Sequence, residues 1–358
     1  MAERPILMTG ASGFLGRDCL RLFAGLPAAP GLVLLLRQQA RERLQQDGLL
    51  RPEWEWLEGD LSRERLGLSI AEYERLARRL GGIFHCAGNV RFDLDLRAAR
   101  QVNLGGTQRL LELAAAANSS SAIRLRFDHV STAYVVGRRS GSFVEGEGPG
   151  AAGFCNSYEQ SKWEAEQAVL AAAGTLAVTI YRPSIILPTS PGQTQPGAST
   201  PVWCARVFRR GRLVCIPGQK AALLDLIGVD QVARALVGYV TRAQPPGGVI
   251  HLSAGCAHSV ALGELVELAA RQFGVRPPPW MKPHTFRRWV RPLLWLTLYG
   301  RRRSVWRSGE NLLPYLEQSR CFEPLRAAAD FPGWYDEAGR IRARLRQLLD
   351  DLQQAGRL

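Results

Sequence analysis

The sequence predicts an α/β protein in which a doubly wound parallel sheet is followed by a smaller, mostly helical lobe. Short apolar runs alternate with amphipathic helical stretches from residue 6 to about residue 185, as a parallel sheet with crossover helices requires. The first apolar run breaks into a glycine-rich turn that opens a helix. Beyond residue 185 the alternation gives way to a loop rich in Pro and Gly and then to mainly helical patterns.

Length and composition support one large core with a second lobe. The 358 residues are 46% hydrophobic and 22% charged. The first strand begins too early for a signal peptide, and no apolar run approaches the roughly 20 residues that span a bilayer, so we expect a cytoplasmic protein. The seven cysteines are scattered and contain no C-x-x-C pair. We therefore expect reduced cysteines and no metal site.

The glycine turn lies in residues 6–16, Ile-Leu-Met-Thr-Gly-Ala-Ser-Gly-Phe-Leu-Gly. Gly10 permits a tight turn, Gly13 lets a pyrophosphate approach, and Gly16 lets the helix pack closely on the strand. The phosphates of a dinucleotide would then bind the free N–H groups of the helix N-terminus. The spacing differs from G-x-G-x-x-G, so an ordinary tight turn is the alternative. Its position between strand and helix favours a Rossmann-type site contacted by Gly10, Ser12, Gly13, Phe14, Leu15 and Gly16.

The second strand, residues 32–36, is wholly apolar and is followed by Arg37. At this position an acid would bind the 2′-hydroxyl of NAD, whereas a cation favours the 2′-phosphate of NADP. Arg41 and Arg43 lie nearby in the sequence. The pattern therefore predicts NADPH as the cofactor, with a surface arginine that has no such role as the alternative.

Two further strands bring polar and small residues to the same edge of the sheet. A strand near residues 54–57 leads into Asp60 and Leu61, and Asp60 can accept a hydrogen bond from the adenine amino group. The strand that begins at residue 82 ends in Ala87 and Gly88, which leave room for a cofactor. Asn103, in a helix over residues 96–117, is either a buried partner of the neighbouring loop or a surface amide.

The fifth strand, residues 123–130, ends in Ser131 and Thr132, at the edge where such sheets bind ligands. Tyr158 and Lys162 then open a helix that runs to about residue 173, and their spacing places them on one face. Of the 46 basic residues only Lys162 and two others are lysines, which indicates that a compact ammonium is needed here. A sixth strand, residues 176–181, leads to two more expected cofactor contacts, Pro183 and Ser184.

This set of side chains predicts a reductase or dehydrogenase. Tyr158 would exchange a proton with a carbonyl oxygen, while the ammonium of Lys162 favours the phenolate and lowers the tyrosine pKa. Thr132 would hold the oxygen as charge develops on it, with Ser131 as a second candidate. We place the dinucleotide-binding domain at residues 1–185, with 225–253 returning to it.

The substrate lobe is assigned to residues 186–224 and 254–358, and its most distinctive part is a basic, tryptophan-rich segment, 271–307. No acid occurs between Glu267 and Glu310. We expect an anionic partner with an apolar part: an acyl chain on a phosphorylated carrier, an acidic carrier protein or a membrane surface. A solvated face is the alternative, and no nucleic-acid-binding motif accompanies the charge.

The combined motifs resemble the extended short-chain dehydrogenase/reductases, most closely the fatty acyl-CoA reductases and thioester reductase domains. The resemblance covers residues 5–255 and rests on the following segments: Thr-Gly-Ala-Ser-Gly-Phe-Leu-Gly (9–16), Gly-Asp-Leu (59–61), His-Cys-Ala-Gly-Asn-Val-Arg-Phe-Asp (85–93), Asn103 with Gly-Gly-Thr (105–107), His-Val-Ser-Thr-Ala-Tyr-Val (129–135) and Tyr158-x-x-x-Lys162. Gly88 departs from the alanine usual there, and residues 256–358 match only loosely.

The resemblance implies reduction by NADPH of an acyl thioester, on coenzyme A or an acidic acyl carrier protein, to an aldehyde or onward to an alcohol. It places the catalytic Thr, Tyr and Lys on Thr132, Tyr158 and Lys162. Ribose contacts fall on Ala87 and Gly88, and the phosphate-binding arginine on Arg37. Helices equivalent to 96–117 and 158–173 often pair two subunits in this superfamily, so the resemblance leaves a homodimer as an option. The protein would then be cytoplasmic, with peripheral membrane contact through 271–307 as an option.

Two other functions fit the same residues. Extended family members with this triad also act on free ketones and alcohols, including hydroxysteroids, and need no anionic carrier. A non-catalytic NADP-binding regulator on the same fold is the third reading. Such regulators typically lose the tyrosine or the lysine, and both are present here.

Overall fold

The computed structural model describes residues 4–118, 124–190, 193, 200–210, 213, 215–297 and 310–354. The chain divides into two compact units. The first unit consists of residues 1–135, 157–183 and 229–252, and the second of 136–156, 184–228 and 253–358. Each unit is described by itself.

The first unit is built on a seven-stranded sheet in which every neighbouring pair is parallel. The strand order is β12-β7-β5-β4-β1-β2-β3. Their bounds are β1 Ile6–Thr9, β2 Leu32–Leu36, β3 Glu55–Glu58, β4 Gly82–His85, β5 Arg126–Val130, β7 Ala177–Pro183 and β12 Gly248–Leu252. The strand order turns outward in both directions from β1, which confirms the predicted doubly wound parallel sheet.

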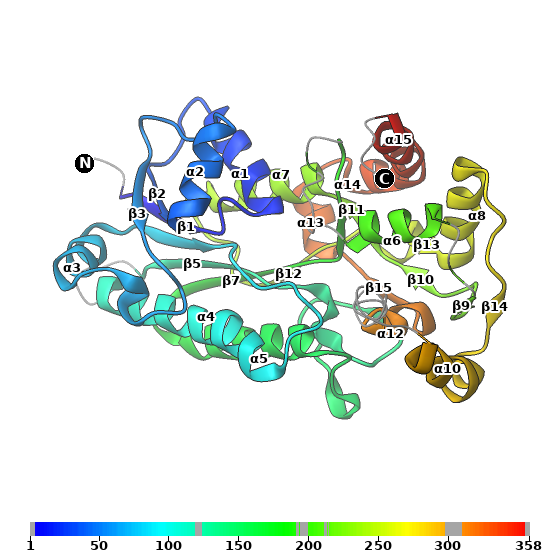
Figure 1. Cartoon of the computed structure of the whole chain (residues 1–358). Helices are drawn as coiled ribbons and strands as arrows, with labels where there is room; N and C mark the ends of the chain where they lie inside the picture. The colour runs from blue at the N-terminus through cyan, green and yellow to red at the C-terminus, as the bar shows by residue number, and fades with distance from the viewer. Residues whose placement is uncertain are drawn as a thin grey trace. The chain divides into compact units, whose positions relative to one another are not determined.

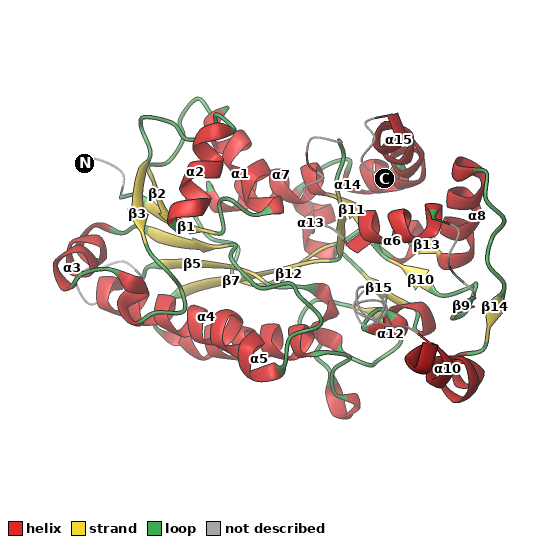
Figure 2. Cartoon of the chain, viewed as in Figure 1, coloured by secondary structure: helices red, strands yellow, loops and turns green. Residues whose placement is uncertain are grey.

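Helices cover both faces of this sheet (Figures 1 and 2). One face carries α1, α2 and α7, and the other carries α3, α4 and α5 (Figure 1). Their bounds are α1 Phe14–Ala24, α2 Gln38–Gln46, α3 Ile70–Arg79, α4 Leu96–Asn118, α5 Ser157–Ala171 and α7 Val229–Val240. The 3-10 segments η1 Glu64–Gly67 and η4 Ala172–Gly174 complete the connections. The expected helices over residues 96–117 and 158–173 are therefore confirmed within about two residues.

The core of this unit is built from the apolar residues whose spacing predicted its strands and helices. All five residues of β2 are buried, as a strand covered on both faces must be. In α4 a stripe at helical spacing faces the sheet, made by Leu110, Leu113, Ala114 and Ala117. Truncating a buried leucine of this kind costs about 2–5 kcal/mol. The packing holds the carboxyl ends of the strands, where the site residues lie, in fixed positions.

The second unit contains short strands and many helices. One sheet has the order β13-β10-β15-β6, and the pairs β11-β8 and β14-β9 stand apart from it. The strands are β6 Gly141–Phe143, β8 Ile185–Leu187, β9 Ile216–Pro217, β10 Leu223–Leu224, β11 Leu226–Gly228, β13 Val260–Ala261, β14 Trp280–Met281 and β15 Arg320–Phe322. The helices are η3 Gly150–Ala152, α6 Thr200–Arg209, η6 Cys256–His258, α8 Leu262–Phe273, α9 Pro283–Thr285, η7 Phe286–Val290, α10 Arg291–Thr297, α12 Leu313–Glu317, α13 Leu325–Asp330, α14 Trp334–Gly339 and α15 Ile341–Gln354.

Two segments belong to different sheets from those expected. Residues 225–253 were expected to return to the main sheet, but β11, within this range, pairs with β8 instead. Only α7 and β12 rejoin the first unit. Residues 136–156, placed by sequence within 1–185, belong to the second unit because β6 pairs with β15. Backbone pairing of such short strands leaves no periodic pattern for a sequence to display.

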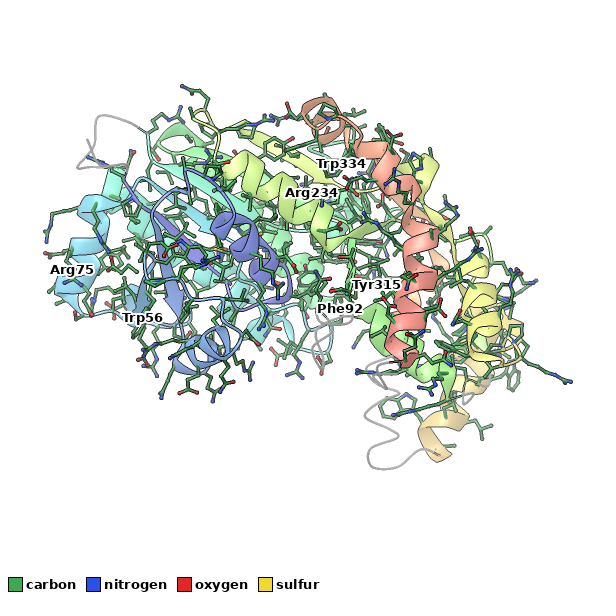
Figure 3. The ribbon with its side chains drawn as sticks, turned by 90° about the horizontal axis from the view of Figure 1, so that it is seen from above. Trp56, Arg75, Phe92, Arg234, Tyr315 and Trp334 are labelled. Carbon is green, nitrogen blue, oxygen red and sulfur yellow. A yellow bond between two sulfur atoms is a disulfide. The ribbon has the colours of Figure 1, made fainter. Side chains whose placement is uncertain are left out.

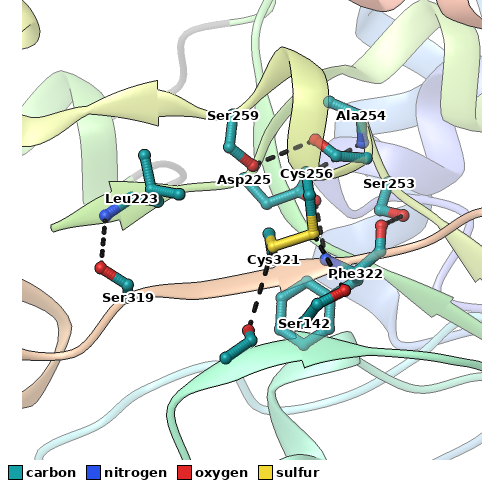
Figure 4. The surroundings of a disulfide bond; sticks show 12 residues. Ser142, Leu223, Asp225, Ser253, Ala254, Cys256, Ser259, Ser319, Cys321 and Phe322 are labelled. Carbon is teal, nitrogen blue, oxygen red and sulfur yellow. Dashed lines mark hydrogen bonds between the residues drawn. A yellow bond between two sulfur atoms is a disulfide. The ribbon is translucent and has the colours of Figure 1, made fainter.

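The expectation that all cysteines are reduced was wrong. Cys256 and Cys321 form a disulfide within the second unit, with their Cα atoms 4.9 Å apart (Figure 4). Beside it, the buried Asp225 accepts hydrogen bonds from the backbone N–H groups of Ala254 (2.8 Å) and Phe322 (3.2 Å). The two cysteines are 65 residues apart, so only the tertiary pairing of β15 brings them together. The two hydrogen bonds to Asp225 link Ala254 and Phe322, which lie in the same two segments as the bonded cysteines.

The described part of the chain holds no cluster of three or more His, Cys, Asp or Glu side chains suited to a metal ion. Within that same part, no helix has the length and apolar character needed to cross a bilayer.

Candidate active site

The glycine turn has the close contacts that its residue types predict. Gly10 has a φ of +76°, and a Cβ there would lie 2.5 Å from the backbone nitrogen of Ala87. A Cβ on Gly16 would overlap the Gly10 carbonyl oxygen. Gly13 is the N-cap of α1, and its N–H donates to the Gly10 carbonyl over 2.9 Å. The turn therefore leaves the free N–H groups at the N-terminus of an eleven-residue helix available to a ligand.

The residues of this turn differ in their exposure. Ser12 and Phe14 are half-buried and Gly13 is exposed, while Leu15 and Gly16 pack inward. Ala87 is held close because its N–H donates to Thr9 Oγ1 over 3.3 Å. The turn and the end of β4 thus form one cradle of backbone groups. A Cβ on Gly10 would clash with the backbone of this cradle. This arrangement fits a dinucleotide pyrophosphate.

Arg37 and Asp60 lie at the ends of β2 and β3. Arg37 is exposed and is the N-cap residue of α2. Burial would raise the pKa of Asp60, but hydrogen bonds from the N–H and hydroxyl of Ser62, aided by the charge of Arg37, lower it below its usual value. Asp60 is therefore an ionised acceptor already shared with Ser62. Next to it, the Leu61 carbonyl accepts from Arg109 over 3.1 Å.

Arg41 has an aromatic partner. Its guanidinium lies 3.7 Å from the ring centroid of Trp56, which Figure 3 labels on β3. This cation–π contact occupies Arg41 on the protein surface. Arg37 is consequently the better placed of the two for a ligand phosphate.

Asn103 is a buried hydrogen-bonding residue. It is therefore the partner of the neighbouring loop and not a surface amide. Its Oδ1 accepts the N–H of Asn89 over 2.7 Å, and its Nδ2 donates to the Asn89 carbonyl and to Ser161 Oγ. Both ends of the amide are engaged by protein. Asn103 therefore fixes the loop after β4 against α5, and with it Gly88.

Tyr158 and Thr132 are in direct contact. Burial raises the pKa of Tyr158 to about 12, although a hydrogen bond with the Thr132 side chain opposes this shift. We expected Lys162 to lower the tyrosine pKa, but burial has the largest effect on it and raises it. The phenol is thus protonated at neutral pH, which is the form a proton donor needs. Phe92 flanks it, with ring centroids 5.6 Å apart.

Lys162 is buried one helical turn along α5 from Tyr158. Its Nζ donates to the Val130 carbonyl over 2.7 Å and lies 3.4 Å from His129 Nε2. Burial lowers the pKa of Lys162 to about 8, partly offset by the charge of Glu166. A Cβ on Gly88 would be 3.9 Å from Nζ, so the ammonium faces the expected ribose-binding loop.

Ser131 is buried beside Thr132, and its N–H donates to the Tyr181 carbonyl over 2.7 Å. Pro183 is the buried last residue of β7, whereas Ser184 begins a segment of the second unit. Neither Ser131 nor Pro183 contacts Tyr158 through a hydrogen bond found in the described parts of the chain. Their proposed roles depend on position alone.

Sequence reasoning missed two buried histidines. His85 Nδ1 lies 2.8 Å from Thr9 Oγ1 and its Nε2 3.1 Å from Thr107 Oγ1, so it connects β1, β4 and α4. His129 contacts Lys162. The available signal was position: His85 ends an apolar run directly before Cys86, Ala87 and Gly88, and His129 lies two residues before Ser131.

Comparison with known proteins decides the family. Residues 8–236 match the model of an NAD-binding family described as male sterility protein. The chain belongs to this family. It is an NAD(P)-binding protein of the extended short-chain dehydrogenase/reductase kind. The resemblance inferred from the motifs is thereby confirmed.

Individual relatives refine this assignment. Fatty acyl-CoA reductase 2 of Mus musculus is 28% identical over 298 residues, covering 68% of this chain and 56% of that protein. The PKS-NRPS hybrid synthetase cheA of Chaetomium globosum is 31% identical over 251 residues, covering 65% of this chain and 5% of that protein. The chain therefore spans about half of the first relative and a small part of the second.

Solved structures of this family's fold agree with the architecture. The terminal R domain from the myxalamid PKS-NRPS pathway aligns with a TM-score of 0.73 at 24% identity, covering all of this chain and 92% of that one. The reductase domain of a nonribosomal peptide synthetase from Mycobacterium tuberculosis aligns with a TM-score of 0.70 at 22% identity, covering 99% and 93%. At these identities the likeness establishes the fold.

Proposed function

We propose that this protein reduces an acyl thioester to an aldehyde with NADPH, using Thr132, Tyr158 and Lys162. The observation that carries the proposal is the contact between Thr132 and a protonated Tyr158, with Lys162 one turn away on α5. The relatives named fatty acyl-CoA reductase and PKS-NRPS synthetase support a thioester as the substrate. Onward reduction to the alcohol is a second round at the same residues.

The dinucleotide is assigned to the cradle formed by Gly10, Gly13 and Ala87, with the pyrophosphate at the N-terminus of α1. When bound, it supplies a hydride to the thioester carbonyl carbon. Its other contacts are proposed from position and family resemblance and are made by Ser12, Phe14, Leu15, Gly16, Arg37, Asp60, Leu61, Gly88, Asn103, Tyr158, Lys162, Pro183 and Ser184.

The chain's own residues manage the charge and the proton. The hydroxyls of Thr132 and Tyr158 hold the carbonyl oxygen as its negative charge grows, and Tyr158 gives its proton to that oxygen. The Lys162 ammonium stabilises the phenolate that results. Tyr158 then takes the proton back as the C–S bond breaks, and the departing sulfur takes a proton from solvent. The thioester thus gains one hydride and one proton and yields an aldehyde and a thiol.

We infer NADPH rather than NADH because Arg37, which is exposed, follows β2 at the position where an acid would bind the ribose 2′-hydroxyl of NAD. A guanidinium pairs well with a phosphate. Asp60, whose carboxylate the charge of Arg37 helps to stabilise, accepts its hydrogen bonds from Ser62.

The substrate carrier is proposed to be anionic, as coenzyme A and acidic carrier proteins are. Support comes from the segment 271–307, of which residues 298–307 lie outside the described residues. Trp289, Leu293 and Leu296 are exposed at helical spacing on η7 and α10, beside Arg288. The same stripe supports peripheral membrane contact as a further proposal. A homodimer through α4 and α5 is proposed only because the equivalent helices often pair subunits in this superfamily.

The deciding experiment is consumption of NADPH with a panel of acyl-CoA thioesters, free aldehydes and cyclic ketones, with products identified. The proposal expects thioester-dependent oxidation that releases one free thiol per aldehyde formed. NADPH oxidation with free ketones alone would instead assign the protein to ketone reduction. Retained activity in Tyr158→Phe would show that Tyr158 is not the proton donor.

A further inference from the structure

His129 is a buried residue to which the proposed reaction gives no role. It lies in β5 directly opposite His85 of β4, and the two ring centroids are 5.1 Å apart. Both side chains are fully buried. Burying two imidazoles beside a lysine carries a desolvation cost, so their placement needs a physical explanation.

The two histidines have different partners. His85 is held at both ring nitrogens by Thr9 and Thr107, which fix its orientation. His129 has Nε2 3.4 Å from Lys162 Nζ, and no described residue is hydrogen-bonded to its Nδ1. The packing against His85 and the approach of Lys162 are therefore the interactions that define the orientation of this ring.

We propose that His129 is a positioning residue for Lys162: its Nε2 accepts one N–H of the ammonium while the Val130 carbonyl accepts another. An ammonium has three N–H donors, so one remains. The remaining donor faces the side of Gly88, where the ribose is placed by the proposed function on which this inference rests. Accepting at Nε2 requires the neutral tautomer with its proton on Nδ1.

The charges around the pair are consistent with this arrangement. Lys162 interacts with Glu166 on its own helix, with His85 of β4 and Cys86 directly after it, and with His129 of β5. Burial holds the pKa of His129 well below its usual value, with the charge of Lys162 adding to the effect. A neutral imidazole can accept from the ammonium without repelling it. Burial likewise raises the pKa of Cys86 to about 12, so its thiol stays uncharged.

The test uses the scarcity of lysine in this chain. Selective 13C labelling of the three lysines gives three ε-carbon signals, and Lys162→Arg identifies the one from Lys162. Its pH titration in the intact protein then reports the Lys162 pKa without any need for turnover. We expect a midpoint near 8 in the native protein.

Three substitutions of His129 separate positioning from packing. His129→Gln places an amide near Nε2, so the midpoint should stay within about half a unit of the native value. His129→Asn reaches only the Nδ1 position, and His129→Leu offers no acceptor. Both should lower the Lys162 midpoint by about one unit or more, because the ammonium loses an acceptor. The fall of kcat at high pH should move to lower pH by the same amount.

Thr107→Val is the matched control, because it removes a buried bond to His85 but leaves the Lys162 contacts intact. It should reduce thermal stability without moving the Lys162 midpoint. An unchanged midpoint in folded His129→Asn or His129→Leu would overturn the proposal; where the leucine variant does not fold, the Gln and Asn pair decides. A shifted midpoint in a protein that reduces no thioester would leave the positioning role standing and refute the proposed function instead.

Discussion

At the scale of single residues, the site combines a protonated acid with a buried cation. Burial raises the pKa of Tyr158 to about 12 and lowers that of Lys162 to about 8. The two shifts have the same cause and act in opposite directions, since burial disfavours whichever form is charged. Near neutral pH the tyrosine is therefore neutral and the lysine largely charged, and activity should fall as pH rises through the pKa of Lys162.

The first residue-scale prediction concerns Tyr158→Phe. Removing the hydroxyl takes away the proton donor and one of the two groups that hold the carbonyl oxygen. We expect kcat to fall about 100- to 10,000-fold, while the dissociation constant of NADPH, measured by fluorescence titration, changes little. Tyr73→Phe on α3 is the control and should keep full activity. A comparable kcat in both variants would contradict the assignment.

A second prediction at this scale concerns Arg37→Asp. The substitution replaces the proposed phosphate partner with an acid that suits a ribose 2′-hydroxyl. The kcat/KM with NADPH should drop about 10- to 100-fold, as expected for a lost hydrogen bond to a charged group, and kcat/KM with NADH should rise. The ratio of the two constants is the measurement. Arg75→Asp, at an exposed position of α3, serves as control, and an equal change there would count against a specific role for Arg37.

At the scale of elements, the turn between β1 and α1 depends on glycine for close packing. A Cβ on Gly16 would meet the Gly10 carbonyl oxygen, so Gly16→Ala should destabilise the first unit by about 1–3 kcal/mol and weaken NADPH binding. Gly174→Ala is the matched control, because its Cβ would meet nothing within 4 Å. Chemical denaturation and NADPH titration of both variants make the comparison. Equal stability and equal affinity in the two would show that the close packing is not required.

The disulfide is the element-scale feature of the second unit. Closing a loop of 65 residues contributes about 4 kcal/mol in the chain-entropy model, so reduction should lower the melting temperature of this unit. Cys256→Ser with Cys321→Ser should reproduce the loss and then be insensitive to reductant. Thermal melts with and without reductant provide the measurement. Native protein that melts identically in both conditions would show that the bridge contributes nothing in solution.

At the scale of the whole molecule, the features that depend on neighbouring residues in the sequence were predictable. The features made by pairing of residues far apart in the sequence were not. The apolar run of β2 and the glycine turn are local, and both were located from sequence. The pairing of β6 with β15, the Cys256–Cys321 bond and the approach of His129 to Lys162 each join residues far apart in the chain. The placement of Thr132, Tyr158 and Lys162 was predictable because they follow a strand or open a helix, where parallel sheets gather ligands.

The excess of positive charge yields the prediction that belongs to the whole chain. A formal charge of +14 attracts anionic substrates over distances that salt screens, since the Debye length falls from about 30 Å at 0.01 M to about 3 Å at 1 M. If coenzyme A is the carrier, KM for an acyl-CoA should rise several-fold over that range with kcat nearly constant. The matching acyl-pantetheine thioester, which lacks the phosphates, should show a KM almost independent of salt. Equal salt dependence for both substrates would mean that the charge serves another partner, because the phosphates are the only feature that distinguishes them electrostatically.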